Sequence, residues 1–534
     1  MAREDSTAKR KGGLGVTDLV MLGFGSIIGA GLFVASGVAV KAAGPAVLLA
    51  FLIGGAGVWG VLSAMAEMAA NNPSPGGLRT FARQALGPWM GFTVGWMYWT
   101  SGVLTMSSEV TAAALLTHIW LPHVPLWLLS LAYSVLITGV NFMDVRGFGK
   151  IESGLSVIKV VALVGFVLLG GYFLLRLRGA APGLAFIRSS HTGLFPTGLR
   201  GLWGAMLMVV FSYAGVQVVA MAAPETRDPE RTIPLGIKSM AGGLVTLYLL
   251  AFAVLVALLP WQKAAPQVSP FVQAMSGVGV GWADAVLTFV IITAALSALN
   301  SSLYSVSRML FALAQKGEAP ALFLRENRYN VPVWAVASSS LVLGLAIALA
   351  YFLPHGVYLL ITSASGTIAM FNWSVLCLCH IRYRRTLQKL HPEGLVYKAW
   401  GYPWYSWLTM AFALSILLTA PFQPGQSAGV FVFLGMVSLI SLVYLSAIRP
   451  RRQAAAALRV AQRAAPGAPP QPAPAVQESP VIPGPVPAFA FETADEMLRR
   501  QEAITADPPL AVIGSDTLGP VAIYPAPNEK APSP

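Results

Sequence analysis

Apolar stretches long enough to cross a bilayer alternate with short polar segments over most of the chain. A transmembrane helix needs roughly 20 predominantly apolar residues to span a hydrocarbon core of about 30 Å. We therefore predict an all-α polytopic membrane protein with twelve transmembrane helices. The predicted spans are residues 16–40, 45–70, 88–117, 125–142, 151–175, 200–222, 241–260, 282–313, 333–353, 356–380, 403–421 and 427–448, with approximate edges.

The composition supports this interpretation. Hydrophobic residues make up 56% of the chain and charged residues only 11%, which is too little charge to cover several water-soluble domains. The net charge of +13 is compatible with a nucleic-acid partner, but the basic residues lie between the apolar spans and form no stripe. We therefore expect the protein to contact the lipid bilayer and not to bind nucleic acid.

The basic residues also predict the topology. Up to Arg452, most Lys and Arg residues lie in the segments that are inside if the N-terminus is cytoplasmic. The positive-inside rule then places both termini in the cytoplasm of a multi-pass protein of the plasma membrane. We divide the chain into a cytoplasmic tail (1–14), a twelve-helix transporter domain (15–449) and a Pro- and Ala-rich cytoplasmic tail (450–534) whose composition predicts disorder.

The first span contains four glycines within nine residues, from Gly23 to Gly31. Each costs about 1 kcal/mol relative to Ala in a continuous helix. Irregular backbone at membrane depth is tolerated only where it is buried in protein or lines a cavity. A half-helix that starts there presents N–H groups suited to a carboxylate, although close helix packing through small residues is an equal alternative. The candidate site residues are Ser26, Ile27, Ile28, Gly29, Ala30 and Gly31.

The sixth span is interrupted in a similar way. Its polar and small residues give a second candidate set, Phe211, Ser212, Tyr213, Ala214 and Gly215. Each interrupted span opens a group of five, which we place at about 16–175 and 200–380, with two extra helices at about 403–448. Interruptions at corresponding positions of two halves indicate an inverted-repeat transporter with a binding site at the membrane midplane.

Several longer motifs carry a resemblance to a known family. They are residues 25–31 in span one, 44–46 at the start of span two, 67–68 before 73–77, 95–99 in span three, 225–234 after span six and 293–310 in span eight. Over residues 14–448 the chain resembles the amino acid-polyamine-organocation superfamily, most closely its bacterial amino acid permeases. The sequence departs from the pattern at Gln217, where many similar proteins carry Glu.

The resemblance implies a five-plus-five inverted-repeat fold with broken helices one and six, and alternating access. It also implies recognition of the amino and carboxyl groups of the substrate by unwound backbone in those two spans. Family members of this branch are usually importers driven by protons, so the resemblance implies a small-molecule amino acid and the proton as partners.

Two ionisable residues lie within predicted spans, where such groups are functional hypotheses by default. Lys159 lies in span five, and the resemblance implies that its amine takes the place of a sodium ion beside span one, which favours proton coupling. The alternative is a lysine that extends to the inner surface. Glu109 in span three is a candidate proton relay, a partner for a cationic substrate side chain, or a structural hydrogen-bonding group.

Glu67 and Glu225 lie at inner span ends. We predict that they form gating salt bridges with Arg79, Arg227 or Arg231, with a merely solvated charge as the alternative.

The sequence contains no nucleophile elbow, Walker loop, metal-ligand spacing or dinucleotide-binding fingerprint in a plausible context. We therefore expect no enzymatic activity, no cofactor and no metal. The leading hypothesis is a secondary active transporter that imports neutral amino acids by proton symport. An amino acid exchanger and a non-transporting amino acid sensor are the alternatives.

Overall fold

The computed structural model describes residues 14–72, 76–143, 145–177, 181–189, 193–265, 269–277, 279, 281–352, 357–390, 395 and 397–454. Helices account for most of these residues, and the described backbone contains only the isolated β-bridges Leu14–Thr226 and Glu326–Pro332. Most of the predicted N-terminal tail, and the predicted disordered tail from residue 455 onward, lie outside the described residues.

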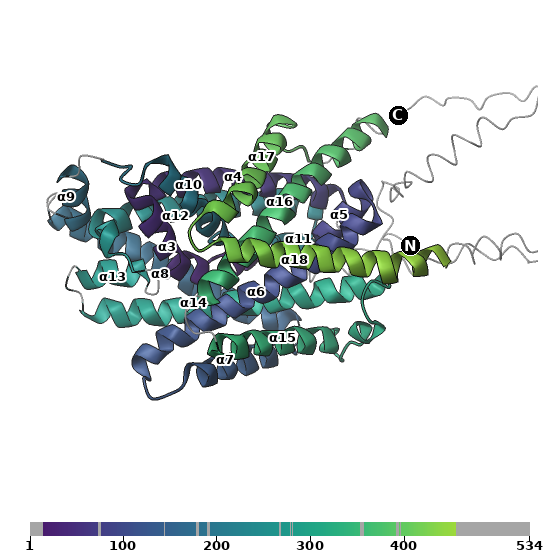
Figure 1. Ribbon diagram of the computed structural model, residues 1–534, viewed down its shortest axis with the longest axis horizontal. Coiled ribbons are helices and arrows are strands. Elements are labelled where there is room, and N and C mark those ends of the chain that lie inside the picture. The colour runs from purple at the N-terminus through teal and green to yellow at the C-terminus, as the bar shows by residue number, and fades with distance from the viewer. Residues whose placement is uncertain are drawn as a thin grey trace, which may run out of the picture. The chain divides into compact units, whose positions relative to one another are not determined.

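Each predicted span corresponds to one helix or to a broken helix. In chain order they are α2 (Val16–Ile27) with η1 (Gly31–Ala35) and α3 (Ser36–Ala43), α4 (Val47–Asn71), α6 (Pro88–Trp120), α7 (Leu126–Asn141), α8 (Val145–Arg176), α10 (Gly198–Phe211) with α11 (Val218–Ala222), α12 (Pro229–Leu258), α14 (Gly281–Gln315), α15 (Val333–Phe352), α16 (Val357–Leu390), α17 (Trp404–Thr419) and α18 (Ser427–Val443) with η7 (Tyr444–Ile448). They form a helical bundle in which α7 lies beside α15 (Figure 1). The all-α fold class with broken helices one and six is therefore confirmed.

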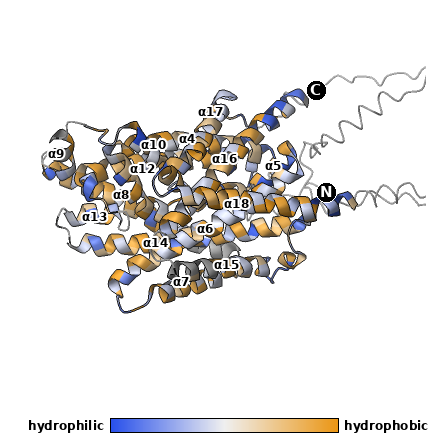
Figure 2. Cartoon of the chain, in the orientation of Figure 1, coloured by the Kyte–Doolittle hydropathy of each residue, from blue (hydrophilic) through white to orange (hydrophobic). Residues whose placement is uncertain are grey.

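The hydropathy of the helices matches a membrane environment. Among the described residues, seven helical stretches are long and apolar enough to cross a bilayer, and shorter apolar helices such as α2, α7 and α10 accompany them. Figure 2 shows hydrophobic residues along most of the helix lengths. The long α6 is more mixed, because it carries Glu109 and a series of Ser and Thr residues.

Three short helices were not predicted: α5 (Gly77–Leu86), α9 (Pro182–Ser189) and α13 (Pro270–Gly277). Each has at most ten residues, which is too short to span a bilayer at 1.5 Å per residue. The amphipathic α5 packs against α6 and buries Arg79. It therefore places a charged side chain next to α6.

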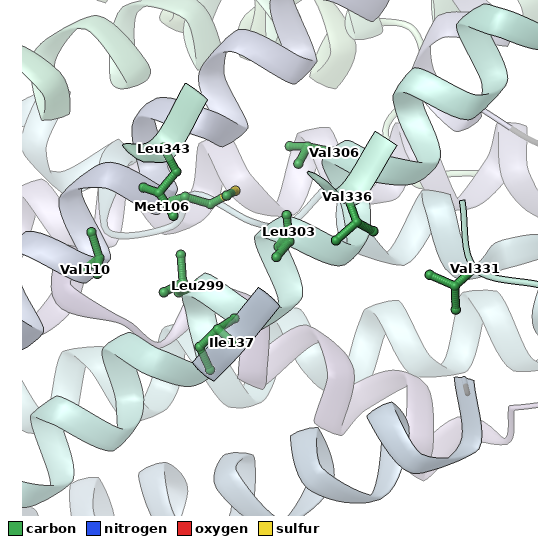
Figure 3. Packing of buried hydrophobic residues seen from close by; sticks show 9 residues of the cluster. All are labelled: Met106, Val110, Ile137, Leu299, Leu303, Val306, Val331, Val336 and Leu343. Atoms are coloured by element: carbon green, nitrogen blue, oxygen red, sulfur yellow. The ribbon is translucent and has the colours of Figure 1, made fainter. Parts of the chain in front are cut away.

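Helices α6 and α14 pack along each other and set the geometry of the centre. Their shared core contains Met106 and Val110 of α6 with Leu299, Leu303 and Val306 of α14 (Figure 3). Residues of α7 and of the α15 region complete this cluster. Because Met106 and Val110 are both fully buried, the rotation of α6 about its axis is fixed, and so is the direction in which the neighbouring Glu109 points.

Candidate functional site

The first span is interrupted within the predicted segment. Helix α2 ends at Ile27, and Ile28 adopts an extended conformation with φ −77° and ψ 97°. Helical structure resumes at Ala30 and continues through the π-helical turn η1 into α3. The interruption at Ile28 and Gly29 leaves the last carbonyl groups of one half and the first amide groups of the other without helical partners.

The sixth span is interrupted at the corresponding place. Helix α10 ends at Phe211, residues 212–217 form turns, and α11 starts at Val218. Gly215 has φ +99°, a left-handed backbone conformation that residues other than glycine rarely adopt. Ala214, Gly215 and Gln217 are partly exposed although residues on either side are buried.

The two interruptions contact each other. Ser26 Oγ donates a hydrogen bond to the carbonyl oxygen of Gly215 at 3.2 Å, across 189 positions of sequence. Ser212 Oγ donates to the carbonyl oxygen of Gly31 at 2.7 Å. A Cβ atom on Gly215 would overlap the Ser26 carbonyl, so glycine is required for this close approach. Two unwound segments thus expose backbone polar groups at one place in the bundle.

Glu109 lies at the amide end of the first interruption. Its Oε2 accepts the backbone N–H of Ala30 at 2.7 Å, and the side chain is only 3% exposed. A Cβ atom on Gly29 would lie 2.6 Å from its Oε1, so the missing side chain at Gly29 makes room for the carboxylate. The carboxyl group therefore caps the half-helix that starts at Ala30, where the partial positive charge of the helix dipole favours its ionised form.

Lys159 lies at the carbonyl end of the same interruption. The side chain is fully buried, and Nζ donates a hydrogen bond to the carbonyl oxygen of Gly25. The amine thus faces the end of α2, whose partial negative charge favours a cation. This position is incompatible with the alternative of a lysine that extends to the membrane surface.

Glu152 was not predicted as a site residue, but it is buried seven residues before Lys159 on α8. Its carboxylate accepts hydrogen bonds from Ser297 Oγ and from Asn300 Nδ2, the latter at 3.0 Å. Asn141 Nδ2 donates in turn to Asn300 Oδ1 at 2.8 Å. Residues seven apart lie on one face of a helix, so the spacing between Glu152 and Lys159 was the available signal.

Glu67 forms a buried polar cluster with α16, not with α5. Its Oε2 accepts Arg384 Nη1 at 3.1 Å and the backbone N–H of Ala399 at 2.6 Å, and His380 Nε2 lies 3.3 Å away. Glu225 accepts the hydroxyl of Tyr304 at 2.9 Å. The Nε atom of Arg308 lies 3.6 Å from the same carboxylate.

The predicted pairing with Arg79 was wrong. Arg79 is buried against Glu318, which also binds Arg83 at 3.1 Å and Arg452. The physical reason is that α5 packs along α6, which brings Arg79 to Glu318 at the end of α14. Burial, followed by the charge of Arg452, lowers the pKa of the Arg83 guanidinium below its ordinary value.

A metal-binding arrangement is not formed by the described residues, which contain no group of three His, Cys, Asp or Glu side chains that could hold an ion. Cys377 and Cys379 are buried free thiols. The centre offers backbone hydrogen bonding, hydroxyl groups and the buried ionisable side chains of Glu109, Glu152 and Lys159.

The sequence matches a known protein family and several of its members. The sequence profile of the amino acid permease family matches residues 18–453. The γ-aminobutyric acid permease of Bacillus subtilis (strain 168) is 34% identical over 438 residues, which cover 81% of this chain and 92% of that protein. The γ-aminobutyric acid permease of Escherichia coli (strain K12) is 35% identical over 421 residues (78% and 89%). The aromatic amino acid transport protein AroP of the same strain is 30% identical over 437 residues (82% and 95%).

The contact between the two interruptions is tested by Gly215→Ala. The new methyl group would overlap the Ser26 carbonyl and force a left-handed conformation on alanine, so we expect a destabilisation of about 1–3 kcal/mol. The measurement is the thermal unfolding midpoint of the detergent-solubilised protein. Gly165→Ala in α8 is the matched control, because nothing lies within 4 Å of its added methyl group. Equal midpoints for the two variants would contradict the close approach of the interruptions.

Proposed function

Because the chain belongs to the amino acid permease family, a family of membrane transporters and not of enzymes, we propose that it imports net-neutral amino acids by proton symport. The observation that carries the proposal is the contact between two unwound segments from corresponding spans, beside the buried carboxylates of Glu109 and Glu152 and the buried amine of Lys159. Such interruptions supply backbone groups for a zwitterion at the midplane of inverted-repeat transporters.

The two segments offer complementary ends for an amino acid. In this proposal the substrate carboxylate binds amide groups of the set Ser26, Ile27, Ile28, Gly29, Ala30 and Gly31. The amino group binds backbone carbonyls of the second set, Phe211 to Gly215. A half-helix N-terminus favours the anion, and carbonyl groups at a helix end favour the cation.

The preference for a neutral substrate is supported by how the charged side chains are used. Glu109, Lys159 and Glu152 each hydrogen-bond to the protein. Hydroxyl groups lie nearby between α6 and α16, where Thr105 Oγ1 and Ser365 Oγ are 2.8 Å apart. These groups suit a small or polar substrate without an extra charge. Two of the relatives are γ-aminobutyric acid permeases, which makes γ-aminobutyric acid the first candidate.

Alternating access requires an inner gate that opens and closes. Leu14 pairs through its backbone with Glu225 and Arg227, both at 2.9 Å, and so ties the start of α2 to the segment after span six. Glu225 also contacts Tyr304 and Arg308 of α14. We propose that these contacts close the cytoplasmic side and that the Glu67 cluster holds the inner end of α4 against α16. In this proposal both termini are cytoplasmic, as the positive-inside rule predicts.

The substrate class is tested by competition in proteoliposomes. Labelled γ-aminobutyric acid uptake is measured under an inward pH gradient, with unlabelled neutral, acidic and basic amino acids, butyrate and butylamine as competitors. Neutral amino acids should compete, whereas butyrate lacks the amine and butylamine lacks the carboxylate, so neither should. If lysine or glutamate competed best, the neutral preference would be wrong. If butyrate competed equally well, the substrate class itself would be wrong.

Proton coupling is tested by Lys159→Ala, with Lys263→Ala at an exposed position as control. The variant lacks the amine that holds the end of α2 at the Gly25 carbonyl, so a proton taken up elsewhere in the centre can no longer bias the inward-open and outward-open populations. We expect accumulation against the substrate gradient to be lost while counterflow exchange continues. The measurement compares pH-driven uptake with counterflow in the same vesicles. Accumulation that persists in the variant would contradict the role of Lys159, and wild-type protein that shows counterflow only would indicate an exchanger.

A further inference from the structure

The amide that should receive the substrate carboxylate already holds a carboxylate of the protein. Glu109 Oε2 accepts the N–H of Ala30 at 2.7 Å. Ala30 is the first helical residue after the interruption, so this N–H heads the half-helix on which the proposed function places the substrate. The Glu109 carboxylate thus lies where the proposed function places the carboxylate of the substrate.

Two carboxylates cannot occupy this position while both are charged. Like charges at hydrogen-bond distance disfavour a second ionised form strongly, and one of the two takes up a proton instead. An N–H group has one hydrogen to donate, so Glu109 must release Ala30 before a substrate carboxylate can bind it.

Glu109 has little freedom to move away. Its Oε1 lies close to Gly29, where a Cβ atom would be 2.6 Å from it, and the same Cβ would be 2.8 Å from Ala298 of α14. The flanking Met106 and Val110 are fully buried in the core shared by α6 and α14. Glu109 therefore remains beside Ala30 when it releases the amide, where a protonated carboxyl group can hydrogen-bond to the incoming carboxylate.

We propose that substrate binding is linked to protonation of Glu109, so that the carrier takes up one proton together with each amino acid. The inference rests on the proposed function and specifies its coupling step. The Glu109 carboxylate accepts a proton from water, and its O–H then donates to the incoming carboxylate. The freed N–H of Ala30 donates to the same substrate group. The charge at this position is unchanged, because one anionic carboxylate replaces another.

Other titratable groups surround Glu109 without sharing this role. Those that interact electrostatically with it are Lys159 of α8, Tyr248 of α12 and Tyr358 of α16. Lys159 binds the Gly25 carbonyl at the opposite end of the interruption, and Tyr248 donates to the carbonyl of Ser212 at 3.2 Å. The Tyr358 hydroxyl is buried and has no hydrogen-bond partner among the described residues. Only Glu109 holds the Ala30 amide in the described contacts.

The test is calorimetric titration of the purified full-length protein with γ-aminobutyric acid, and with L-phenylalanine as a second probe. Each titration is run in two buffers with different ionisation enthalpies, which gives the number of protons bound per ligand. At a pH at which Glu109 of the ligand-free protein is ionised, wild-type protein should take up about one proton. Its affinity should fall by up to about tenfold per pH unit above the pH at which Glu109 ionises, because linkage is reciprocal.

Glu109→Gln supplies a permanently neutral side chain. It should bind the same probe without proton uptake and with an affinity independent of pH, while the exposed control Glu326→Gln should behave as wild type. Binding without proton uptake in the wild type would overturn the inference and leave the proposed function standing. So would proton uptake that persists in Glu109→Gln, or a folded Glu109→Gln protein that no longer binds. Failure of both probes to bind wild-type protein at any pH would overturn the proposed function and the inference with it.

Discussion

Unpaired backbone groups inside a membrane are the constraint on which the rest of this structure depends. Each N–H or C=O group left without a partner in the hydrocarbon costs several kcal/mol, so two interrupted helices are stable only if other groups replace the lost helical bonds. Ser26 and Ser212 do this between the interruptions, Glu109 does it for the Ala30 amide, and Lys159 does it for the Gly25 carbonyl. The residues proposed to act in transport are therefore the same residues that make the interruptions possible.

The two charges are placed according to the dipoles of the half-helices. The anion of Glu109 lies at the N-terminal end of the second half, and the cation of Lys159 lies at the C-terminal end of the first half. Each charge is stabilised by the helix end that it faces. A change in protonation at either position alters how firmly the two halves are held, which provides a physical route from a proton to a conformational equilibrium.

Much of the fold was predictable because it follows from local composition. The twelve spans follow from apolar length, and both interruptions follow from small and polar residues at mid-span positions, such as Gly29 and Gly215. Lys159 and Glu109 were identifiable because charged residues are rare at that depth. Glu152 was missed because it lies at the edge of its predicted span, where a charge needs no explanation.

Long-range partners were not predictable from one sequence. Glu67 pairs with Arg384 across 317 positions, whereas the predicted partner Arg79 lies 12 positions away and pairs with Glu318. The occupation of the Ala30 amide by Glu109 depends on the rotation of α6, which is set by the packing of Met106 and Val110 against α7, α14 and α15. No local pattern encodes such a rotation.

The central claim is that the two interruptions form one amino acid site. It is tested most directly by an experimental structure of the carrier with γ-aminobutyric acid bound in lipid nanodiscs. The account predicts the ligand carboxylate within about 3 Å of the Ala30 amide nitrogen, its amine against the backbone of residues 211–215, and Glu109 no longer bonded to Ala30. A ligand bound away from both interruptions, with the contact between Glu109 and Ala30 intact, would contradict it.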